Sequence, residues 1–396
     1  MDCYRNSFTK RLTVVIIIQI IAFKTYKWYN LRMYVRKHND FFIMDCKIQV
    51  DELQNNIIKS IKREFIMKKL TKEEKHKQCL KEIKATYGSK GINNLTLNDK
   101  GIAEITDDTQ MTLFTAEGIL RANCKKGRCY IPAVVYNAYL RWYSTQRNID
   151  TSGYDKCTYN SYLLKYDELY EDRGAGNTCL TSLSKEEIGS IKNPINNSKG
   201  CGGVMRVAPI GLVYNKKEAF RLGCDCAALT HGHPSGYISG GMLSCIISCI
   251  IEGMEIDEAI NCAISFAKDM DGYCECVETV EKAVKLSEDD LVDTDAIRMI
   301  GEGWASDEVL AIAIYNSLKY KDDFKKALIC SVNHDGDSDS TGAICGNILG
   351  AYLGIDNIPK EWIDVIELKD LLENISTDLL TGYEESEEWF EKYLEN

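Results

Sequence analysis

Residues 335–353 read DGDSDSTGAICGNILGAYL and join an acidic cluster to an apolar segment of helical length. Three aspartates alternate with small polar residues, and a carboxylate at a helix N-terminus is stabilised by the helix dipole. The apolar part, Ser340 to Leu353, carries small residues that allow neighbouring backbones to approach closely: Gly342, Ala343, Gly346, Gly350 and Ala351. The stretch predicts a buried helix that begins beside a group of carboxylates.

Helical patterns of the same kind continue outward from this stretch. No alternating run of strand length recurs, and no repeat of 20–50 residues is visible. We therefore predict an all-α fold, a compact bundle of many helices. The segments with the clearest helical pattern are Thr109–Asn123, Ala227–Glu252, Asp257–Lys268, Asp307–Tyr320 and Asp322–Cys330.

The first part of the chain differs in composition from the rest. All 28 Gly and all 5 Pro come after residue 87, beginning with Gly88 and Pro132. We predict an atypical extension over residues 1–75 and one domain over residues 77–396.

The apolar run Leu12–Phe23 is too short to span a bilayer as a helix, and no small-x-small cleavage site follows it. We expect no membrane span. The alternatives for the extension are an irrelevant or poorly ordered segment, a signal anchor at residues 12–23, and an incorrectly assigned start of the chain.

Charge and cysteine content exclude several classes of protein. Of the 396 residues, 59 are acidic and 48 basic, a net charge of −11, whereas general nucleic-acid binding requires clustered Lys and Arg. The 17 Cys are odd in number and scattered, and several lie in apolar stretches, such as Cys245, Cys249 and Cys262. We interpret them as reduced core residues of a cytoplasmic protein. Without a Cys-x-x-Cys pair, a structural zinc site is not expected.

A second acidic cluster, Thr106-Asp-Asp-Thr-Gln110, also precedes a predicted helix. Carboxylate and hydroxyl oxygens are the ligands that hard cations such as Mg²⁺ prefer. The alternative for either cluster alone is ordinary helix capping, but capping does not require three Asp in five residues. An EF-hand is excluded, because Ser340 stands where its turn glycine belongs and Gly346 where a bidentate Glu is required.

Three polar, glycine-rich segments lie between the predicted helices. They offer backbone N–H groups suited to phosphate or ribose, although none matches a P-loop or a dinucleotide-binding Gly-x-Gly-x-x-Gly. For each segment alone, a tight turn is the simpler interpretation. The segments are Arg173–Cys179, Lys199–Arg206 and Thr230–Pro234.

Together these stretches resemble the ADP-ribosylglycohydrolase family, which includes the dinitrogenase reductase-activating glycohydrolase. They occur in the family's order and at its approximate spacing, from about residue 77 to about residue 390. The matching stretches are Ile105-Thr-Asp-Asp-Thr-Gln-Met-Thr-Leu113, Gly176-Asn-Thr-Cys179, Gly200-Cys-Gly-Gly-Val-Met-Arg-Val-Ala-Pro209, Leu229-Thr-His-Gly-His-Pro234 and Val332-Asn-His-Asp-Gly-Asp-Ser-Asp-Ser-Thr-Gly-Ala343.

The resemblance implies a Mg²⁺-dependent hydrolase with a two-metal site, in some members occupied by Mn²⁺. It would cleave the glycosidic bond between ADP-ribose and a modified protein side chain or a related ADP-ribosyl conjugate. Asp107 and Asp337 are also candidates for the general base or acid. The implied metal ligands are Thr106, Asp107, Asp108, Asp337, Asp339 and Ser340, and the implied ADP-ribose pocket contains Asn177, Gly202, Gly203, Met205 and His231.

One part of the family's pattern is missing. Members begin with a Gly-Asp-Ala-Leu-Gly-like helix, followed by a Val-Glu-Phe-like element whose Glu contacts the reacting end of the substrate. Here no Gly precedes residue 88, so the first element is absent. Arg63-Glu64-Phe65 is the stretch most similar to the second element. Glu64 is therefore the candidate for a third catalytic residue.

The alternative function is a catalytically weak ADP-ribose-binding or structural protein on the same fold, as in certain lens crystallins. We expect a monomer.

Overall fold

A computed structural model of the protein describes residues 79–125, 128–150 and 160–393. Within these ranges all regular secondary structure is helical, apart from two isolated bridges, Ala103–Ile366 and Gly200–Ala305, which confirms the predicted all-α class. The α-helices are α5 (Cys79–Tyr87), α6 (Asp107–Cys124), α7 (Ile131–Arg147), α9 (Asn177–Leu183), α10 (Ala208–Val213), α11 (Lys216–Ala228), α12 (Pro234–Ile251), α13 (Ile256–Ala267), α14 (Cys274–Ser287), α15 (Asp293–Ile300), α16 (Ser306–Lys319), α17 (Phe324–Val332), α18 (Ser338–Leu353), α19 (Lys360–Ile363), α20 (Lys369–Thr381) and α21 (Glu387–Tyr393); short 3₁₀ turns are η2 (Tyr162–Lys165), η3 (Asp167–Tyr170), η4 (Cys201–Gly203) and η5 (Ile355–Asn357).

The predicted helices agree with the structure except in one place. Five of the six segments lie within two residues of α6, α13, α16, α17 and α18. The expected helical segment Ala227–Glu252 was wrong, because the chain breaks between α11 and α12. Pro234 at the first turn fixes the backbone for a new helix start, and the His233 side chain accepts a hydrogen bond from the Ser235 backbone N–H. The break places Thr230 and His231 outside any helix.

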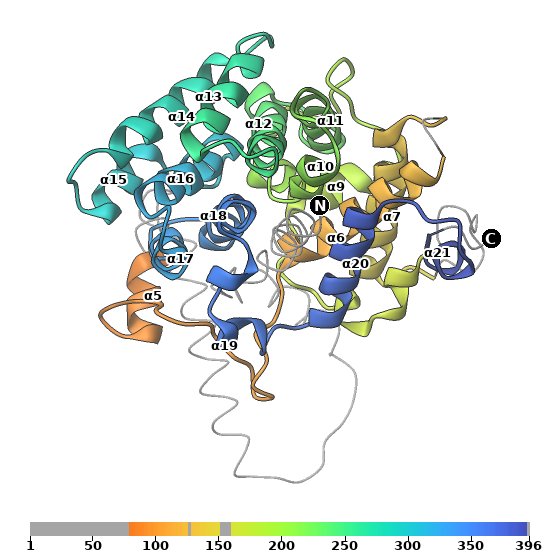
Figure 1. The fold of residues 1–396 in the computed structure, drawn as a ribbon, viewed down its shortest axis with the longest axis horizontal. Helices are drawn as coiled ribbons and strands as arrows, with labels where there is room; N and C mark the ends of the chain where they lie inside the picture. Colours follow the sequence, from red (N-terminus) through yellow and green to blue (C-terminus); the bar gives the residue numbers. More distant parts are fainter. Residues whose placement is uncertain (1–78, 126–127, 151–159, 394–396) are drawn as a thin grey trace, which may run out of the picture.

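The centre of the bundle is α12, which lies between α11 and α13 (Figure 1) and also packs against α10, α16 and α18. Glycines bring α11 and α12 together: a Cβ on Gly223 would lie 2.6 Å from the Gly240 carbonyl oxygen, and one on Gly241 would lie 2.7 Å from that of Phe220. By length and composition α12 could cross a membrane, but nearly all of it is buried inside the protein. Its apolar character is that of a core helix.

A buried ion-pair group joins α6 to α7. The fully buried carboxylate of Glu117 on α6 accepts two hydrogen bonds from the Arg141 guanidinium on α7, at 2.7 and 3.1 Å. Arg121, one turn further along α6, lies 3.2 Å from the other carboxylate oxygen. The two guanidinium groups outweigh the effect of burial and lower the pKa of Glu117. The group therefore holds the helix whose first turn carries Asp107 and Asp108.

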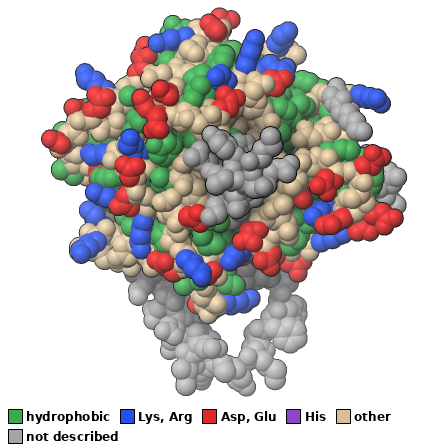
Figure 2. Space-filling model, viewed as in Figure 1, with side chains coloured by type: hydrophobic (Ala, Val, Ile, Leu, Met, Phe, Trp, Pro, Cys, Tyr) green, Lys and Arg blue, Asp and Glu red, His purple; other side chains and the backbone are tan. Residues whose placement is uncertain are grey.

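On the face drawn in Figure 2, the described acidic and basic side chains are interspersed. A mixed distribution of this kind keeps a protein soluble and creates no extended field of one sign there.

Candidate metal and substrate site

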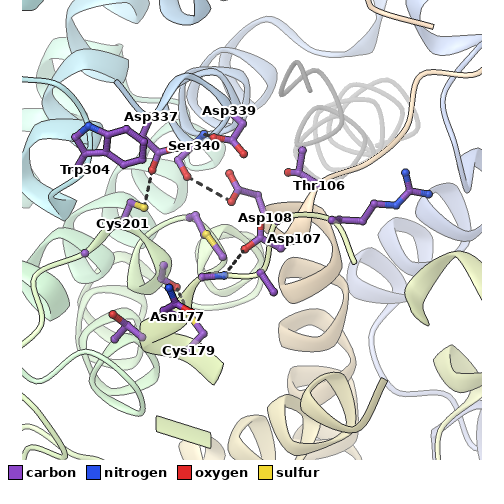
Figure 3. Close-up of a pocket in the computed structure, with 18 of the residues that line it drawn as sticks. Thr106, Asp107, Asp108, Asn177, Cys179, Cys201, Trp304, Asp337, Asp339 and Ser340 are labelled. Carbon is purple, nitrogen blue, oxygen red and sulfur yellow. Dashed lines mark hydrogen bonds between the residues drawn. The ribbon is translucent and has the colours of Figure 1, made fainter. Parts of the chain in front are cut away.

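A cavity of about 270 Å³ opens where α6 and α18 begin (Figure 3). Six separate parts of the chain line it: both acidic clusters, all three glycine-rich segments and Trp304. The lining residues are Thr106, Asp107, Asp108, Arg173, Gly174, Ala175, Gly176, Asn177, Thr178, Cys179, Gly200, Cys201, Gly202, Met205, His231, Trp304, Asp337, Asp339 and Ser340.

The two acidic clusters meet in this cavity although they are far apart in the sequence. Ser340 Oγ donates a hydrogen bond to Asp108 Oδ1 at 3.3 Å, across 232 positions of the chain. Carboxylate oxygens of Asp107, Asp108 and Asp339 all lie within 4.8 Å of one another, and Figure 3 shows these side chains facing one another. The structure therefore joins the clusters into one group of oxygen atoms.

Helix capping does not explain the clusters. Thr106 and Asp337 occupy the N-cap positions of α6 and α18, yet neither side chain makes a capping hydrogen bond. Elsewhere in the described chain, Asn215 and Asp323 do cap their helices through side-chain oxygens. The side chains of Thr106 and Asp337 therefore do not serve as caps of the helices that they precede.

The chemistry of these oxygens fits a hard divalent cation. Thr106 Oγ1 and Asp108 Oδ2 are buried without a hydrogen-bond partner among the described residues, which is costly for polar atoms. Burial and the neighbouring charge of Asp339 raise the pKa of Asp107, Asp108 and Asp337 well above the usual value for an aspartic acid. A bound Mg²⁺ would provide the missing partner and offset the repulsion between the carboxylates.

Backbone contacts fix the positions of the two catalytic candidates. The Asp107 N–H donates to the Arg173 carbonyl and its carboxylate accepts from the Gly176 N–H, both at 3.3 Å. The Asp337 N–H donates to the Glu302 carbonyl at 2.9 Å. Glycine is required beside it, because Gly336 has φ +130° and an added Cβ would lie 1.8 Å from the Glu302 oxygen. Cys201 Sγ donates to Asp337 Oδ2 at 2.7 Å.

A chain of hydrogen bonds orients the imidazole of His231. The buried Arg206 donates to Thr230 Oγ1 at 2.6 Å, which leaves the threonine hydroxyl hydrogen free to donate to His231 Nδ1 at 2.8 Å. The other ring nitrogen, Nε2, lies on the side of Gly202. A Cβ added at Gly202 would lie 3.3 Å from this nitrogen, so the glycine leaves room beside the imidazole. His231 therefore presents its Nε2 to the cavity.

His231 is expected to remain neutral through the whole physiological pH range. Burial, aided by the positive charge of Arg206, lowers its pKa to about 3. In an NMR pH titration of the imidazole resonances, the signal removed by His231→Gln should show no inflection between about pH 5 and pH 8. The unfolded chain binds this proton below about pH 6.5, so the contribution of His231 to stability is lost as the pH falls from about 6.5 toward 3. An inflection near pH 6 would contradict this arrangement.

The structure places the residues predicted from the sequence as follows. All six proposed metal ligands line the cavity, as do Asn177, Gly202, Met205 and His231. Gly203 does not: an added Cβ there would meet the Gly236 carbonyl oxygen and the side chains of Ala227 and His231, so Gly203 serves the packing of α11 and α12. Glu64 lies outside the described residues.

Nine further lining residues were not predicted as site residues from the sequence, among them Arg173, Cys201 and Trp304. Cys201 and Arg173 belong to glycine-rich segments that the sequence analysis quoted, but nothing in the sequence indicated that their side chains face the site. Arg173 pairs with Glu104 at 3.0 Å and Glu367 at 2.7 Å, which ties the 173–179 segment to the approach of α6. Trp304 follows a Gly-Glu-Gly sequence that carries no recognisable signal.

A sequence model of a family described as ADP-ribosylglycohydrolase matches residues 65–388. The chain belongs to the ADP-ribosylglycohydrolase family. This confirms the resemblance inferred from the five motifs, and the match begins 12 residues before the expected position of residue 77. The division between residues 1–75 and 77–396 stays a prediction.

The chain shares only about a quarter to a third of its residues with individual members of the family over the aligned regions. The chain is 31% identical over 184 residues to an uncharacterized protein of Archaeoglobus fulgidus, covering 46% of this chain and 58% of that protein. It is 26% identical over 282 residues to the ADP-ribosylarginine hydrolase Tri1 of Serratia proteamaculans (70% and 67%). It is 24% identical over 227 residues to the ADP-ribosylhydrolase ARH3 of Mus musculus (48% and 61%). The matches thus span about three fifths to two thirds of these relatives.

Among solved structures, the fold is similar to a chain described as an ADP-ribosylglycohydrolase-related protein complex. That match has a TM-score of 0.46 and 23% sequence identity, and it covers 70% of this chain and 81% of the other.

Proposed function

We propose that this protein is a Mg²⁺-dependent hydrolase that cleaves the glycosidic bond between ADP-ribose and a modified protein side chain or a related ADP-ribosyl conjugate. The observation that carries the proposal is the meeting of two acidic clusters, 232 positions apart, on one wall of a cavity whose other walls are glycine-rich loops. Relatives named as hydrolases of ADP-ribosyl groups support the same chemistry.

In this proposal the oxygen atoms of Thr106, Asp107, Asp108, Asp337, Asp339 and Ser340 hold two Mg²⁺, with Mn²⁺ as a substitute. The ions would bind ribose hydroxyls, orient water and offset the charge that develops on the sugar. The two unpartnered buried oxygens, Thr106 Oγ1 and Asp108 Oδ2, support this assignment.

A carboxylate oxygen of Asp107 or Asp337 is proposed to take the proton of the attacking water. General base catalysis requires a positioned group, and hydrogen bonds hold both carboxylates: that of Asp107 accepts from the Gly176 N–H and that of Asp337 from the Cys201 thiol. The Cys201 thiol, which donates to Asp337 Oδ2, would keep one oxygen of that carboxylate occupied and the other directed at the water. Glu64 is proposed as a third catalytic residue.

The glycine-rich walls are proposed to bind the ADP-ribosyl group. Asn177 opens α9 at the cavity edge, and Gly202 leaves space beside the imidazole of His231. The Nε2–H of His231 would donate to an acceptor oxygen of the substrate, and Met205 would cover its apolar surface. No proton transfer is assigned to His231, because its pKa is about 3.

Magnesium should stabilise the folded protein. A ligand that binds only the folded state at 100 times its Kd adds about 2.7 kcal/mol, which for a chain of this size corresponds to a rise in Tm of about 3 to 4 °C. Asp339→Ala should reduce this rise, because the half-buried Asp339 carboxylate is part of the oxygen group. Asp295→Ala, an exposed change on α15, is the control. Equal melting of wild type and Asp339→Ala with and without Mg²⁺ would exclude the proposed metal site.

Binding of ADP-ribose is the direct test of the pocket. Isothermal titration of the full chain with ADP-ribose in the presence of Mg²⁺ should give saturable 1:1 binding, weakened by His231→Ala and unchanged by Asp295→Ala. A hydrolysis assay on the same preparation then separates the two functions. Binding with turnover supports the hydrolase, whereas binding without turnover selects the alternative, a catalytically weak ADP-ribose-binding protein.

A further inference from the structure

Three cysteines form a cluster away from the cavity. Cys245 and Cys249 lie one turn apart on the same face of α12, and Cys262 lies on α13, which packs against it. The three sulfur atoms all lie within 4.8 Å of one another. Cys245 and Cys249 are fully buried and Cys262 is half-buried. One side of the cluster is therefore accessible, and the rest is enclosed by apolar residues.

The spacing of these sulfur atoms is close to that of a metal–thiolate site. With a zinc–sulfur bond of about 2.3 Å, three thiolates arranged trigonally around an ion lie about 4.0 Å apart. Side-chain movements of less than about 1 Å would bring the three atoms to that separation. We propose that Cys245, Cys249 and Cys262 bind a soft, thiophilic d¹⁰ cation, of the chemical class of Cu(I) and Zn²⁺.

Within the cluster, Cys249 is the thiol most readily deprotonated, because burial and the neighbouring thiols raise the pKa of Cys245 and Cys262. A hydrogen bond from the Cys245 thiol lowers the pKa of Cys249 to about 7, and the nearby Lys216 ammonium acts in the same direction. Lys216 lies 3.6 Å from Glu252 at the end of α12. A cation that binds the three sulfur atoms displaces the protons of the thiols.

This site differs from the carboxylate cavity in both place and chemistry. None of the three cysteines lines the cavity. Gly236, near the start of α12, lies beside His231, whereas Cys249 is 13 residues further along, about 20 Å at 1.5 Å per residue. Oxygen ligands prefer Mg²⁺ and sulfur ligands prefer soft ions, so the two sites would hold different metals. A metal ion bound by the three cysteines would cross-link α13 to α12.

The test uses the full chain, fully reduced and free of oxygen, with excess Mg²⁺ to occupy the carboxylates. Cd²⁺ is the probe, because its thiolate complexes absorb in the ultraviolet and ¹¹³Cd NMR reports how many sulfur atoms bind the ion. The first equivalent of Cd²⁺ should give a trithiolate signal, and competition with a chelator gives its affinity. Added Zn²⁺ and Cu(I) should each displace the probe, and their order of displacement identifies which ion the site prefers.

The variants are Cys249→Ala and Cys262→Ala, with Cys226→Ala, a buried cysteine on α11, as the matched control. Each cluster variant should lower Cd²⁺ affinity by about tenfold or more, since outer-shell changes alone cost about 10–100-fold, and the control should bind as wild type does. If Cys249→Ala fails to fold, the half-buried Cys262→Ala decides the question. A first equivalent of Cd²⁺ bound equally by wild type and Cys262→Ala, or a ¹¹³Cd signal without three sulfur ligands, would overturn the proposal.

Discussion

Asp108→Ala and Asp337→Ala should each lower turnover of an ADP-ribosylated substrate by several orders of magnitude. Asp108 belongs to the first acidic cluster and Asp337 to the second, and the structure brings both to one wall of the cavity. Each change removes a proposed metal ligand, and at Asp337 it also removes a candidate general base, a class of group that contributes about 10²–10⁴-fold.

The double variant provides the sharper part of this prediction. Residues that act as one unit are non-additive, so losing both should be little worse than losing either. The measurement is kcat/KM for the two single variants, the double variant and the exposed control Asp295→Ala, which should equal wild type. Multiplicative losses in the double variant would mean that the two clusters do not serve one ribose.

Glu117→Ala should destabilise the folded protein by about 3–5 kcal/mol. Removing one partner of a buried ion pair leaves the other charge uncompensated, and here the change strands Arg141, which is 1% exposed, as well as the largely buried Arg121. The matched comparison is Asp295→Ala, which breaks the exposed pair with Arg298 and should cost no more than about 1 kcal/mol.

Chemical denaturation of wild type, Glu117→Ala and Asp295→Ala gives the free energy of unfolding of each protein, and these values can be compared when the m-values are equal. Because Glu117 lies on the helix that begins with Asp107 and Asp108, partial loss of its anchoring should also weaken Mg²⁺ binding. A cost near that of Asp295→Ala would show that the Glu117 pair does not hold α6 in place.

The sequence permitted prediction wherever a local pattern carried the information. Helical periodicity placed α13, α16 and α18 to within two residues, and alternating aspartates marked the start of α18. The helical pattern drawn from Ala227 to Glu252 ran across Thr230–Pro234, although that segment was also expected between helices and Pro234 is a local signal for the start of α12.

Contacts between distant parts of the chain could not be predicted in the same way. The bond from Ser340 to Asp108 and the pairing of Glu117 with Arg141 depend on how helices pack, which no local spacing encodes. Gly203 shares its motif with Gly202, yet the 3₁₀ turn directs the two residues to different neighbours. The cysteine cluster is hidden for the same reason, since its third member comes from a separate helix.

The most direct test of the central proposal is hydrolysis by the wild-type full chain. An ADP-ribosylated protein or peptide is incubated with metal-stripped enzyme, and released ADP-ribose is measured before and after Mg²⁺ is added. The account predicts turnover that requires Mg²⁺, is restored by Mn²⁺ and is absent in Asp108→Ala. Release of ADP-ribose at the same rate without a divalent cation, or no release from arginine-, serine- and ester-linked substrates while ADP-ribose still binds, would contradict it.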